Sequence, residues 1–282
     1  MMKKFLFLCL VFLFEQAMPI HSQLVYPIVG QYKKKDAQGM AIYNDSAYLF
    51  SDGGRCRVFD LKRAAVVRQF LLNSSSPTNH VNNACFGVEK GSFNNIPLIY
   101  ITECKNKRRC FVEELLPDTA KLKQTIYATK NGKREIVLIW AVDRERKLLY
   151  SITRSDRTID TKGYSLNTIT EYKLPKISDG ADIVLTEKDA LSRFVVHFPS
   201  ILQGAIIKNG ILYIVTGLQQ SKVKRKDSKR AIQVIDLKKK VLLKTIDLTY
   251  LTTNEPEDMD FYNGKALLYC GQEGGIYEVN LK

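Results

Sequence analysis

The sequence predicts an all-β fold, a single five-bladed β-propeller whose ring is closed by a strand that follows an N-terminal signal peptide. Three observations lead to this prediction. Groups of short strand-like segments recur along the chain, at a spacing of roughly 40 to 50 residues. One group contains three strands instead of four. A further strand-like segment near the N-terminus belongs to no group and can complete it, which leaves the ring without open strand edges.

Two groups give the clearest repeat. Residues 38–72 contain QGMAIYN, SAYLFSD, RCRVFDL and VVRQFLL, and residues 203–248 contain QGAIIKN, ILYIVTG, AIQVIDL and VLLKTIDL. Each segment is rich in Val, Ile, Leu, Tyr and Phe, and Asn, Asp, Gly or Lys separate the segments. This pattern is typical of short antiparallel strands joined by turns. The later group differs by an insertion, residues 219–230, between its second and third strands.

Three looser groups complete the repeat. Residues 82–129 contain NNACFGV, IPLIYITE, RRCFVEEL and TIYAT, and residues 139–187 contain IWAVDRE, KLLYSITR, NTITEYKLP and DIVLTE. Residues 257–281 contain only EDMDFYN, ALLYCGQ and GIYEVNL. We expect LVYPIVG, residues 24–30, to supply the missing outer strand. Pro27 is compatible with this position because an outer strand has one unpaired side.

The N-terminus has the layout of a secretory signal peptide. Lys3 and Lys4 precede an unbroken apolar run, residues 5–14, and a polar stretch ends at Ser22. The run is about ten residues long, whereas a membrane-spanning helix needs roughly 20. We therefore expect cleavage after residue 22, a single propeller domain over residues 23–282, and a secreted or periplasmic location.

The charge balance indicates an anionic partner. The chain has 43 Lys and Arg against 29 Asp and Glu, a net charge of +14, and only Lys3, Lys4 and Glu15 of these lie in the signal peptide, so the rest carries +13. Acidic glycans, lipid headgroups and nucleic acid are the partners that such a charge favours. The alternative is a basic surface without a specific partner. The basic insertion, residues 222–230, either contacts an anionic ligand or is a solvated loop.

Several classes of partner and cofactor are not expected. The basic insertion has no interleaved aromatic residues that could stack bases, so we expect no nucleic acid. The sequence lacks a P-loop, a dinucleotide fingerprint, a nucleophile elbow and an HExxH motif, so we expect no cofactor. No Cys or His spacing is typical of zinc sites, and we expect no metal.

The exported chain keeps five cysteines, and an exported protein can form disulfides. A bridge between Cys104 and Cys110 across a predicted hairpin is plausible, and the odd number leaves at least one free thiol. The five are Cys56, Cys85, Cys104, Cys110 and Cys270.

We expect the ligand site at the mouth of the central channel where the first strands begin. The loops between second and third strands lie on the same face and carry residues 105–109, Arg154 with Asp156, residues 222–230, and Gln272 with Glu273. Together they predict a concave, polar and mainly basic surface. The candidate ligand-binding residues are Gln38, Asp52, His80, Asn82, Trp140, Gln203, Glu257 and Asp258.

Four of these candidates have a structural alternative. Gln38 and Gln203 recur at one repeat position, where they either bind sugar hydroxyls or satisfy backbone groups that are costly to bury unpaired. Trp140 either stacks on a sugar or belongs to the core. His80 either lines the mouth or caps the beginning of a strand.

An acidic run, EPEDMD at residues 255–260, raises the possibility of catalysis. Glycoside hydrolysis needs two carboxyl groups roughly 5–9.5 Å apart, and Asp52, Asp182, Glu257 and Asp258 can converge at one mouth. Two first strands begin with Gln rather than with an acid, which weakens the hydrolase interpretation. A bound cation is a further alternative.

The phrases QGMAIYN, QGAIIKN, HVNNACFG with IPLIYITE, and EPEDMDFYNGKALLYC resemble a propeller of bacterial and phage surface proteins. This group includes phage receptor-binding tail proteins, teichoic-acid-associated secreted proteins and helveticin-like bacteriocins. The resemblance covers residues 38–281 and implies recognition of cell-envelope carbohydrate. The chain departs from the pattern at Asn82 and Asn83, which replace Gln-Gly, and at Ile139 and Trp140. The signal peptide also argues against a phage tail protein.

The sequence thus predicts a secreted, non-catalytic binding propeller, a monomer that recognises a cell-envelope glycan or another anionic surface polymer and associates peripherally with the envelope. The alternatives are a glycoside hydrolase-like enzyme with carboxylates at the channel mouth and a protein-interaction scaffold. The fold alone does not decide among them.

Overall fold

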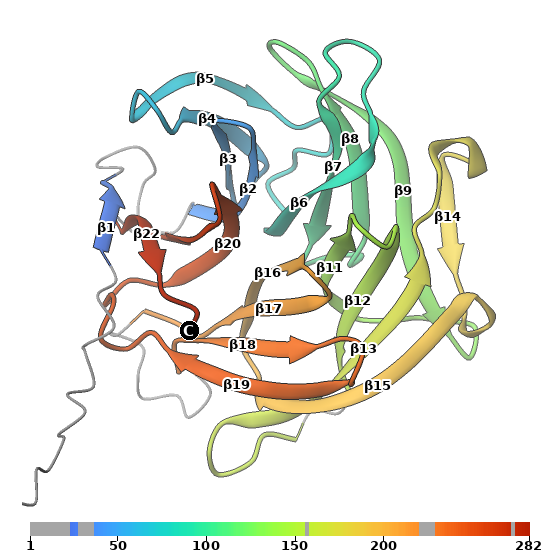
Figure 1. The fold of residues 1–282 in the computed structure, drawn as a ribbon. Coiled ribbons are helices and arrows are strands. Elements are labelled where there is room, and N and C mark those ends of the chain that lie inside the picture. Colours follow the sequence, from blue (N-terminus) through green and yellow to red (C-terminus); the bar gives the residue numbers. More distant parts are fainter. Residues whose placement is uncertain (1–22, 28–36, 156–157, 220–228, 272–273) are drawn as a thin grey trace, which may run out of the picture.

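The computed structural model is a five-bladed β-propeller (Figure 1). It describes residues 23–27, 37–155, 158–219, 229–271 and 274–282. Within this part of the chain the only helices are two short 3-10 turns, η1 (Ile177–Asp179) and η2 (Glu187–Asp189). The predicted signal peptide, residues 28–30 of the predicted closing strand, Asp156, most of the basic insertion, Gln272 and Glu273 lie outside the described residues.

Each blade has four antiparallel strands, ordered from the channel outward, and the second blade carries two further strands at its outer edge. The first blade consists of β2 (Ala37–Tyr43), β3 (Ser46–Ser51), β4 (Arg55–Asp60) and β5 (Ala65–Leu71). The second blade consists of β6 (Val81–Lys90), β7 (Pro97–Glu103), β8 (Cys110–Leu115) and β9 (Ala120–Lys130), with the short β10 (Lys133–Arg134) beside β9.

The other three blades follow the same plan. The third blade consists of β11 (Val137–Asp143), β12 (Leu148–Arg154), β13 (Tyr164–Lys173) and β15 (Ala190–Pro199). The fourth blade consists of β16 (Leu202–Lys208), β17 (Ile211–Thr216), β18 (Ala231–Asp236) and β19 (Val241–Asp247). The fifth blade consists of β20 (Pro256–Tyr262), β21 (Lys265–Cys270), β22 (Gly275–Val279) and β1 (Gln23–Tyr26).

The predicted ring closure is confirmed. β1 pairs antiparallel with β22, with Gln23 opposite Glu278 and Leu24 opposite Tyr277. The Tyr26 ring then packs edge-on against Phe59 of the first blade, with ring centres 5.5 Å apart. The N-terminal strand therefore joins the last blade to the first.

The hydrophobic core lies between neighbouring blades. Tyr48 and Phe50 of the first blade pack against Phe86 and Ile99 of the second, and similar layers fill the other blade interfaces. The buried strands are nearly continuous apolar runs because both faces of each inner strand are covered.

Asn-Gly pairs set two of the hairpins that follow first strands. Asn209 and Gly210 have φ values of 52° and 72°, and Asn263 and Gly264 have φ values of 49° and 80°. Positive φ at both central residues gives a two-residue turn whose twist matches the strands that it joins. These turns fix where β16 and β20 end.

One predicted strand belongs to a different blade. We expected DIVLTE as the fourth strand of the third blade, but β14 (Asp182–Leu185) pairs parallel with β9 at the edge of the second blade. The Gln124 amide donates to the carbonyls of Lys176 and Gly180, at 2.9 and 2.8 Å. These two hydrogen bonds hold the segment that leads into β14 against the second blade. The longer β15 then pairs with β13 along nearly its whole length.

All five cysteines in the described part of the chain are free thiols, so the Cys104–Cys110 bridge is not formed. Cys110 is buried in the core, whereas Cys104 lies 3.1 Å from the Arg108 guanidinium. In the described residues, no helix has the length and apolar character required to cross a membrane.

Candidate functional site

The central channel has two mouths. We call the mouth where the five first strands begin the N-mouth, and the mouth where they end the C-mouth. The first strands are β2, β6, β11, β16 and β20, and each packs against its neighbours around the axis. The sequence-predicted candidates belong to the N-mouth.

The amides at the N-mouth bind neighbouring strands. Asn82 donates from Nδ2 to the carbonyl oxygens of Leu202, at 3.3 Å, and of Gln203. Gln203 donates from Nε2 to the carbonyl of Gly217, at 2.8 Å, and to the Glu255 carboxylate, at 2.9 Å. Both side chains are buried. These contacts support the structural alternative for Gln203 and give Asn82 a similar structural role.

Asp258 lies on the channel axis rather than at the surface. Its Oδ2 accepts hydrogen bonds from the backbone N–H groups of Met40, at 2.8 Å, and Ala84, at 3.2 Å. Its Oδ1 accepts from the N–H of Met259 at 2.8 Å. Burial raises the pKa of the Asp258 carboxyl group well above its usual value. The side chain therefore ties three blades together.

Asn83 has a comparable role that the sequence interpretation missed. It donates from Nδ2 to the Trp140 carbonyl, at 2.8 Å, and its Oδ1 accepts from the Ala205 N–H, at 2.7 Å. It thus joins the second, third and fourth blades. Trp140 is fully buried, and its backbone N–H donates to Thr102 Oγ1 at 3.0 Å. Trp140 is a core residue and not a sugar platform.

The remaining N-mouth candidates are Gln38, Glu257, Asp52 and His80. Gln38 and Glu257 are buried. Asp52 and His80 are partly exposed and form a pair through His80 Nδ1. Partial burial alone would raise the pKa of Asp52. The hydrogen bond and the charge interaction with His80, together with the charge of Lys105, outweigh this effect and lower the pKa of Asp52 below its usual value. The structure thus brings Asp52 and His80 together.

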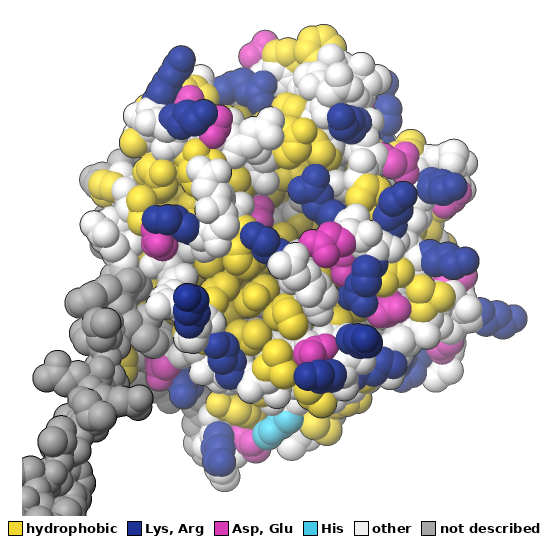
Figure 2. Space-filling view, in the orientation of Figure 1, with side chains coloured by type: hydrophobic (Ala, Val, Ile, Leu, Met, Phe, Trp, Pro, Cys, Tyr) yellow, Lys and Arg dark blue, Asp and Glu magenta, His cyan; other side chains and the backbone are white. Residues whose placement is uncertain are grey.

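The C-mouth holds a cavity of about 550 Å³. Figure 2 shows a hollow near the centre of the ring, bordered by basic, acidic and hydrophobic side chains. All five blades contribute to it. The lining residues are Ile42, Phe86, Val88, Arg144, Glu145, Ile206, Ile207, Lys208, Asp260 and Phe261.

The cavity carries two cations, Lys208 and Arg144. Lys208 Nζ lies 4.1 Å from the centre of the Phe261 ring. Within the described residues, neither Lys208 nor Arg144 forms an ion pair. Arg144 lies in the turn between β11 and β12, where Asp143 Oδ1 accepts from the N–H groups of Glu145 and Arg146, at 3.1 and 3.0 Å. Asp143 thereby fixes the turn that carries Arg144 and Glu145.

Asp260 is one of two acidic residues that line the cavity. Its Oδ2 accepts from the Ile42 N–H at 2.6 Å, and its Oδ1 accepts from the Phe261 N–H at 2.7 Å. Burial raises the pKa of Asp260 to about 6, although Arg144 and Lys208 act in the opposite direction. Because a carboxylate has about four acceptor positions, Asp260 can accept further hydrogen bonds from a ligand.

The sequence interpretation did not select the charged residues of this cavity. Lys208 and Asp260 are charged residues within the first-strand segments QGAIIKN and EDMDFYN. These charges in otherwise buried strands were the sequence feature that could have identified the cavity. In the described part of the chain, His, Cys, Asp and Glu side chains form no group of three or more that could hold a metal ion.

No family model matches the chain, and no curated protein matches it in sequence. Among solved structures, glutaminyl cyclase from Myxococcus xanthus superposes with a TM-score of 0.53 at 13% identity, over 92% of this chain and 95% of that one. At this identity the similarity shows the fold alone.

Two further structures superpose more weakly. Hydrazine synthase from Kuenenia stuttgartiensis has a TM-score of 0.43 at 10% identity, over 83% of this chain and 61% of that one. Raptor from Chaetomium thermophilum has a TM-score of 0.44 at 9% identity, over 84% of this chain and 19% of that one.

Proposed function

We propose that the protein is a secreted, non-catalytic binding propeller for an anionic glycan or another anionic surface polymer, and that an acidic end of this ligand occupies the C-mouth cavity. One observation carries the proposal. The cations Arg144 and Lys208, which form no ion pair in the described part of the chain, share a cavity with two aromatic rings and the carboxyl groups of Glu145 and Asp260.

The cavity matches the chemistry of an acidic sugar. A guanidinium can bind a carboxylate through two parallel hydrogen bonds, and an ammonium adds a second positive charge. Phe261, which is half-buried, offers apolar surface to the C–H face of a sugar ring, while Asp260 can accept hydrogen bonds from hydroxyl groups. The volume of about 550 Å³ lies within the range of roughly 300–1,000 Å³ that small-ligand sites occupy.

The proposed location at the cell envelope rests on the sequence. The first 22 residues have the layout of an export signal, and the repeat phrases resemble those of propellers from bacterial surface proteins. An exported protein with a high positive charge meets acidic polymers at the cell surface, and its charge accelerates association with them.

A glycan array that carries uronic-acid and sialic-acid oligosaccharides beside neutral counterparts tests the proposal. We expect the chain from Gln23 onward to bind acidic members, and Lys208→Ala and Arg144→Ala to weaken binding by about tenfold or more each, since hydrogen bonds to charged groups contribute about 1.5–3 kcal/mol. Lys238→Ala, in the exposed turn between β18 and β19, is the matched control. Equal binding of neutral sugars would contradict the proposal.

Glycoside hydrolysis is a second candidate because Glu145 and Asp260 line the same cavity. A carboxyl group whose pKa is about 6 can act as a general acid near neutral pH. Release of reducing ends from a bound oligosaccharide, lost in Asp260→Asn, would favour the enzyme over the binding protein. Binding without release would exclude it for that oligosaccharide.

A further inference from the structure

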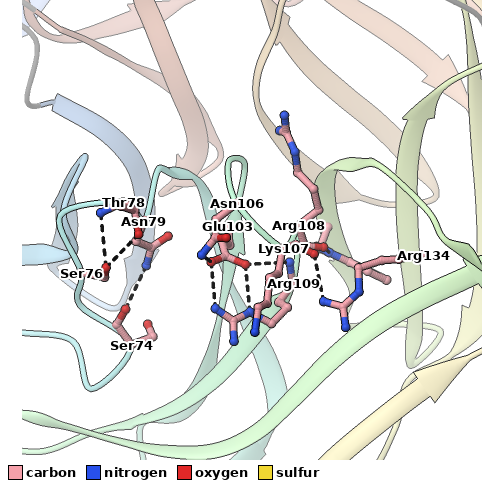
Figure 3. A network of polar contacts seen from close by, with 11 residues as sticks. Ser74, Ser76, Thr78, Asn79, Glu103, Asn106, Lys107, Arg108, Arg109 and Arg134 are labelled. Carbon is pink, nitrogen blue, oxygen red and sulfur yellow. Dashed lines mark hydrogen bonds and ion pairs between the residues drawn. The ribbon is translucent and has the colours of Figure 1, made fainter.

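Four cations gather on the second blade, on the side of the N-mouth and away from the C-mouth cavity. We call this set the basic ridge. It consists of Lys105, Lys107 and Arg108 in the loop between β7 and β8, and of Arg134 in β10. Figure 3 shows Lys107, Arg108 and Arg134 next to one another.

Contacts between the two loops hold the ridge together. The Arg134 guanidinium stacks on the Tyr127 ring at 4.0 Å from its centre, and its Nη1 donates to the Lys107 carbonyl at 3.2 Å. The Arg108 carbonyl accepts from Trp140 Nε1 at 3.5 Å, which anchors the loop to the third blade. Segments that are distant in sequence thus present their charges on one surface.

The ridge keeps most of its positive charge, although Lys105 lies near enough to Asp52 to lower the pKa of that carboxyl group. Glu103 is the acid closest in the chain to residues 105–108, and Arg109 engages both of its oxygens at 2.9 Å. Glu135, which follows Arg134, pairs with Arg193 at 3.3 Å. Within the described residues, none of the four ridge cations has an ion-pair partner. Lys105, Lys107 and Arg134 are exposed.

We propose that the basic ridge binds a linear polymer that carries repeated phosphate groups, at a site separate from the C-mouth cavity. Guanidinium groups match phosphate oxygens with paired donors, and lysines add charge along the chain. Stacking on Tyr127 and the hydrogen bond to the Lys107 carbonyl orient the Arg134 guanidinium group before a ligand binds. This orientation lowers the entropy cost of binding.

The composition of the loop favours a polymer over a lipid surface. Residues 104–109 read CKNKRR and contain no large apolar side chain that could enter a bilayer. Proteins that bind membranes through a surface element usually combine basic residues with buried Trp, Phe or Leu. A row of cations without such residues is better suited to a flexible polyanion in water.

Long-chain inorganic polyphosphate is the probe, and fluorescence anisotropy at two salt concentrations is the measurement. We expect salt-dependent binding by the chain from Gln23 onward, because the polymer releases counterions when its charges are neutralised. The triple variant Lys105→Gln/Lys107→Gln/Arg134→Gln should bind at least about tenfold more weakly, with a shallower salt dependence. Lys208→Ala should bind polyphosphate like the parent, since it changes only the cavity.

The matched control removes three charges elsewhere. Lys238→Gln/Lys239→Gln/Lys240→Gln changes an exposed turn of the fourth blade and should keep the parent affinity. An equal loss in this control would overturn the proposal in favour of attraction by net charge alone. Binding of phosphatidylglycerol–phosphatidylcholine vesicles through the ridge, without binding of polyphosphate, would overturn it in favour of a membrane surface.

Two milder variants keep the test decisive if the triple variant is unstable. Lys105→Gln/Lys107→Gln leaves the contacts of the Arg134 side chain intact and should lose severalfold affinity. Arg134→Lys keeps the positive charge but removes the paired donors of the guanidinium group, and we expect weaker binding. Parent affinity in both variants would overturn the assignment of the ridge.

Discussion

The carboxylate of Asp258 in the fifth blade accepts a hydrogen bond from the backbone N–H of Met40 in the first blade, at 2.8 Å. The same oxygen accepts from Ala84 of the second blade. The blade that closes the ring is therefore bonded to its neighbours at the axis as well as through β1 at the rim. A side chain that the sequence suggested as a ligand contact instead organises the centre of the fold.

Asp258→Asn should lower the free energy of unfolding by about 1–3 kcal/mol, because an amide NH₂ would face a backbone N–H that loses its acceptor. Denaturant unfolding followed by circular dichroism measures the change. Asp118→Asn, at an exposed loop position, is the control and should be neutral. A parent-like Asp258→Asn would show that the axial hydrogen bonds contribute little.

Gly204→Ala should destabilise the fold by about 1–3 kcal/mol through overpacking. A Cβ at Gly204 would lie 2.7 Å from Asp258 Cα and closer still to its carboxylate. Gly53→Ala provides the comparison, since its Cβ would meet only the Ser76 carbonyl at an ordinary 3.6 Å. Equal melting temperatures for the two variants would refute the close packing at the axis.

Tyr26→Ala should weaken the ring closure and lower stability by about 1–2 kcal/mol, because the edge-on contact with Phe59 is lost. Leu24→Ala lies in the same strand at an exposed position and should have a smaller effect. Thermal unfolding of both variants tests the difference. A larger loss in Leu24→Ala would contradict the packing of β1.

Binding of an acidic glycan in the cavity should strengthen as the pH falls from about 7 to about 5. The pKa of Asp260 is about 6, so the carboxyl group is ionised above this range and neutral below it. Protonation removes a negative charge beside Arg144 and Lys208, while Glu145 is the other acid of the cavity. Calorimetric titration at several pH values measures the effect.

Asp260→Asn should flatten this pH dependence, since the variant cannot gain or lose the proton. A dependence that persists unchanged in Asp260→Asn would assign the titration to Glu145 or to the ligand. An affinity that rises with pH would contradict the binding of an anionic ligand near Asp260.

The number of blades and the closing strand could be predicted from the sequence. Strand-like segments can be counted without knowing which strand each one pairs with. The three strands of the last group and the unmatched LVYPIVG determined the closure. The position of DIVLTE was not predictable in this way. Its alternating pattern fits the edge of either blade, and the choice depends on Gln124, whose two carbonyl partners lie more than 50 residues away in sequence.

The candidate site was predicted less well for a related reason. Arg144, Lys208 and Asp260 come from three blades, and each resembles an ordinary residue near a turn in its own repeat. Their importance arises only when the ring brings them around one cavity. At the N-mouth, the sequence could not reveal that the side-chain amides of Asn82 and Gln203 donate to backbone carbonyls.

The pairing of Gln23 with Glu278 also sets the order of events during folding. This contact connects almost the two most distant described positions of the chain, and contacts of such long range form slowly because the intervening chain must first be ordered. The inner strands of the fifth blade are synthesised after the other four blades, so β1 has no partner until translation is nearly complete. Closure of the propeller is therefore expected to be a late step, and the inner strands of all five blades can pair before the N-terminal strand completes the ring.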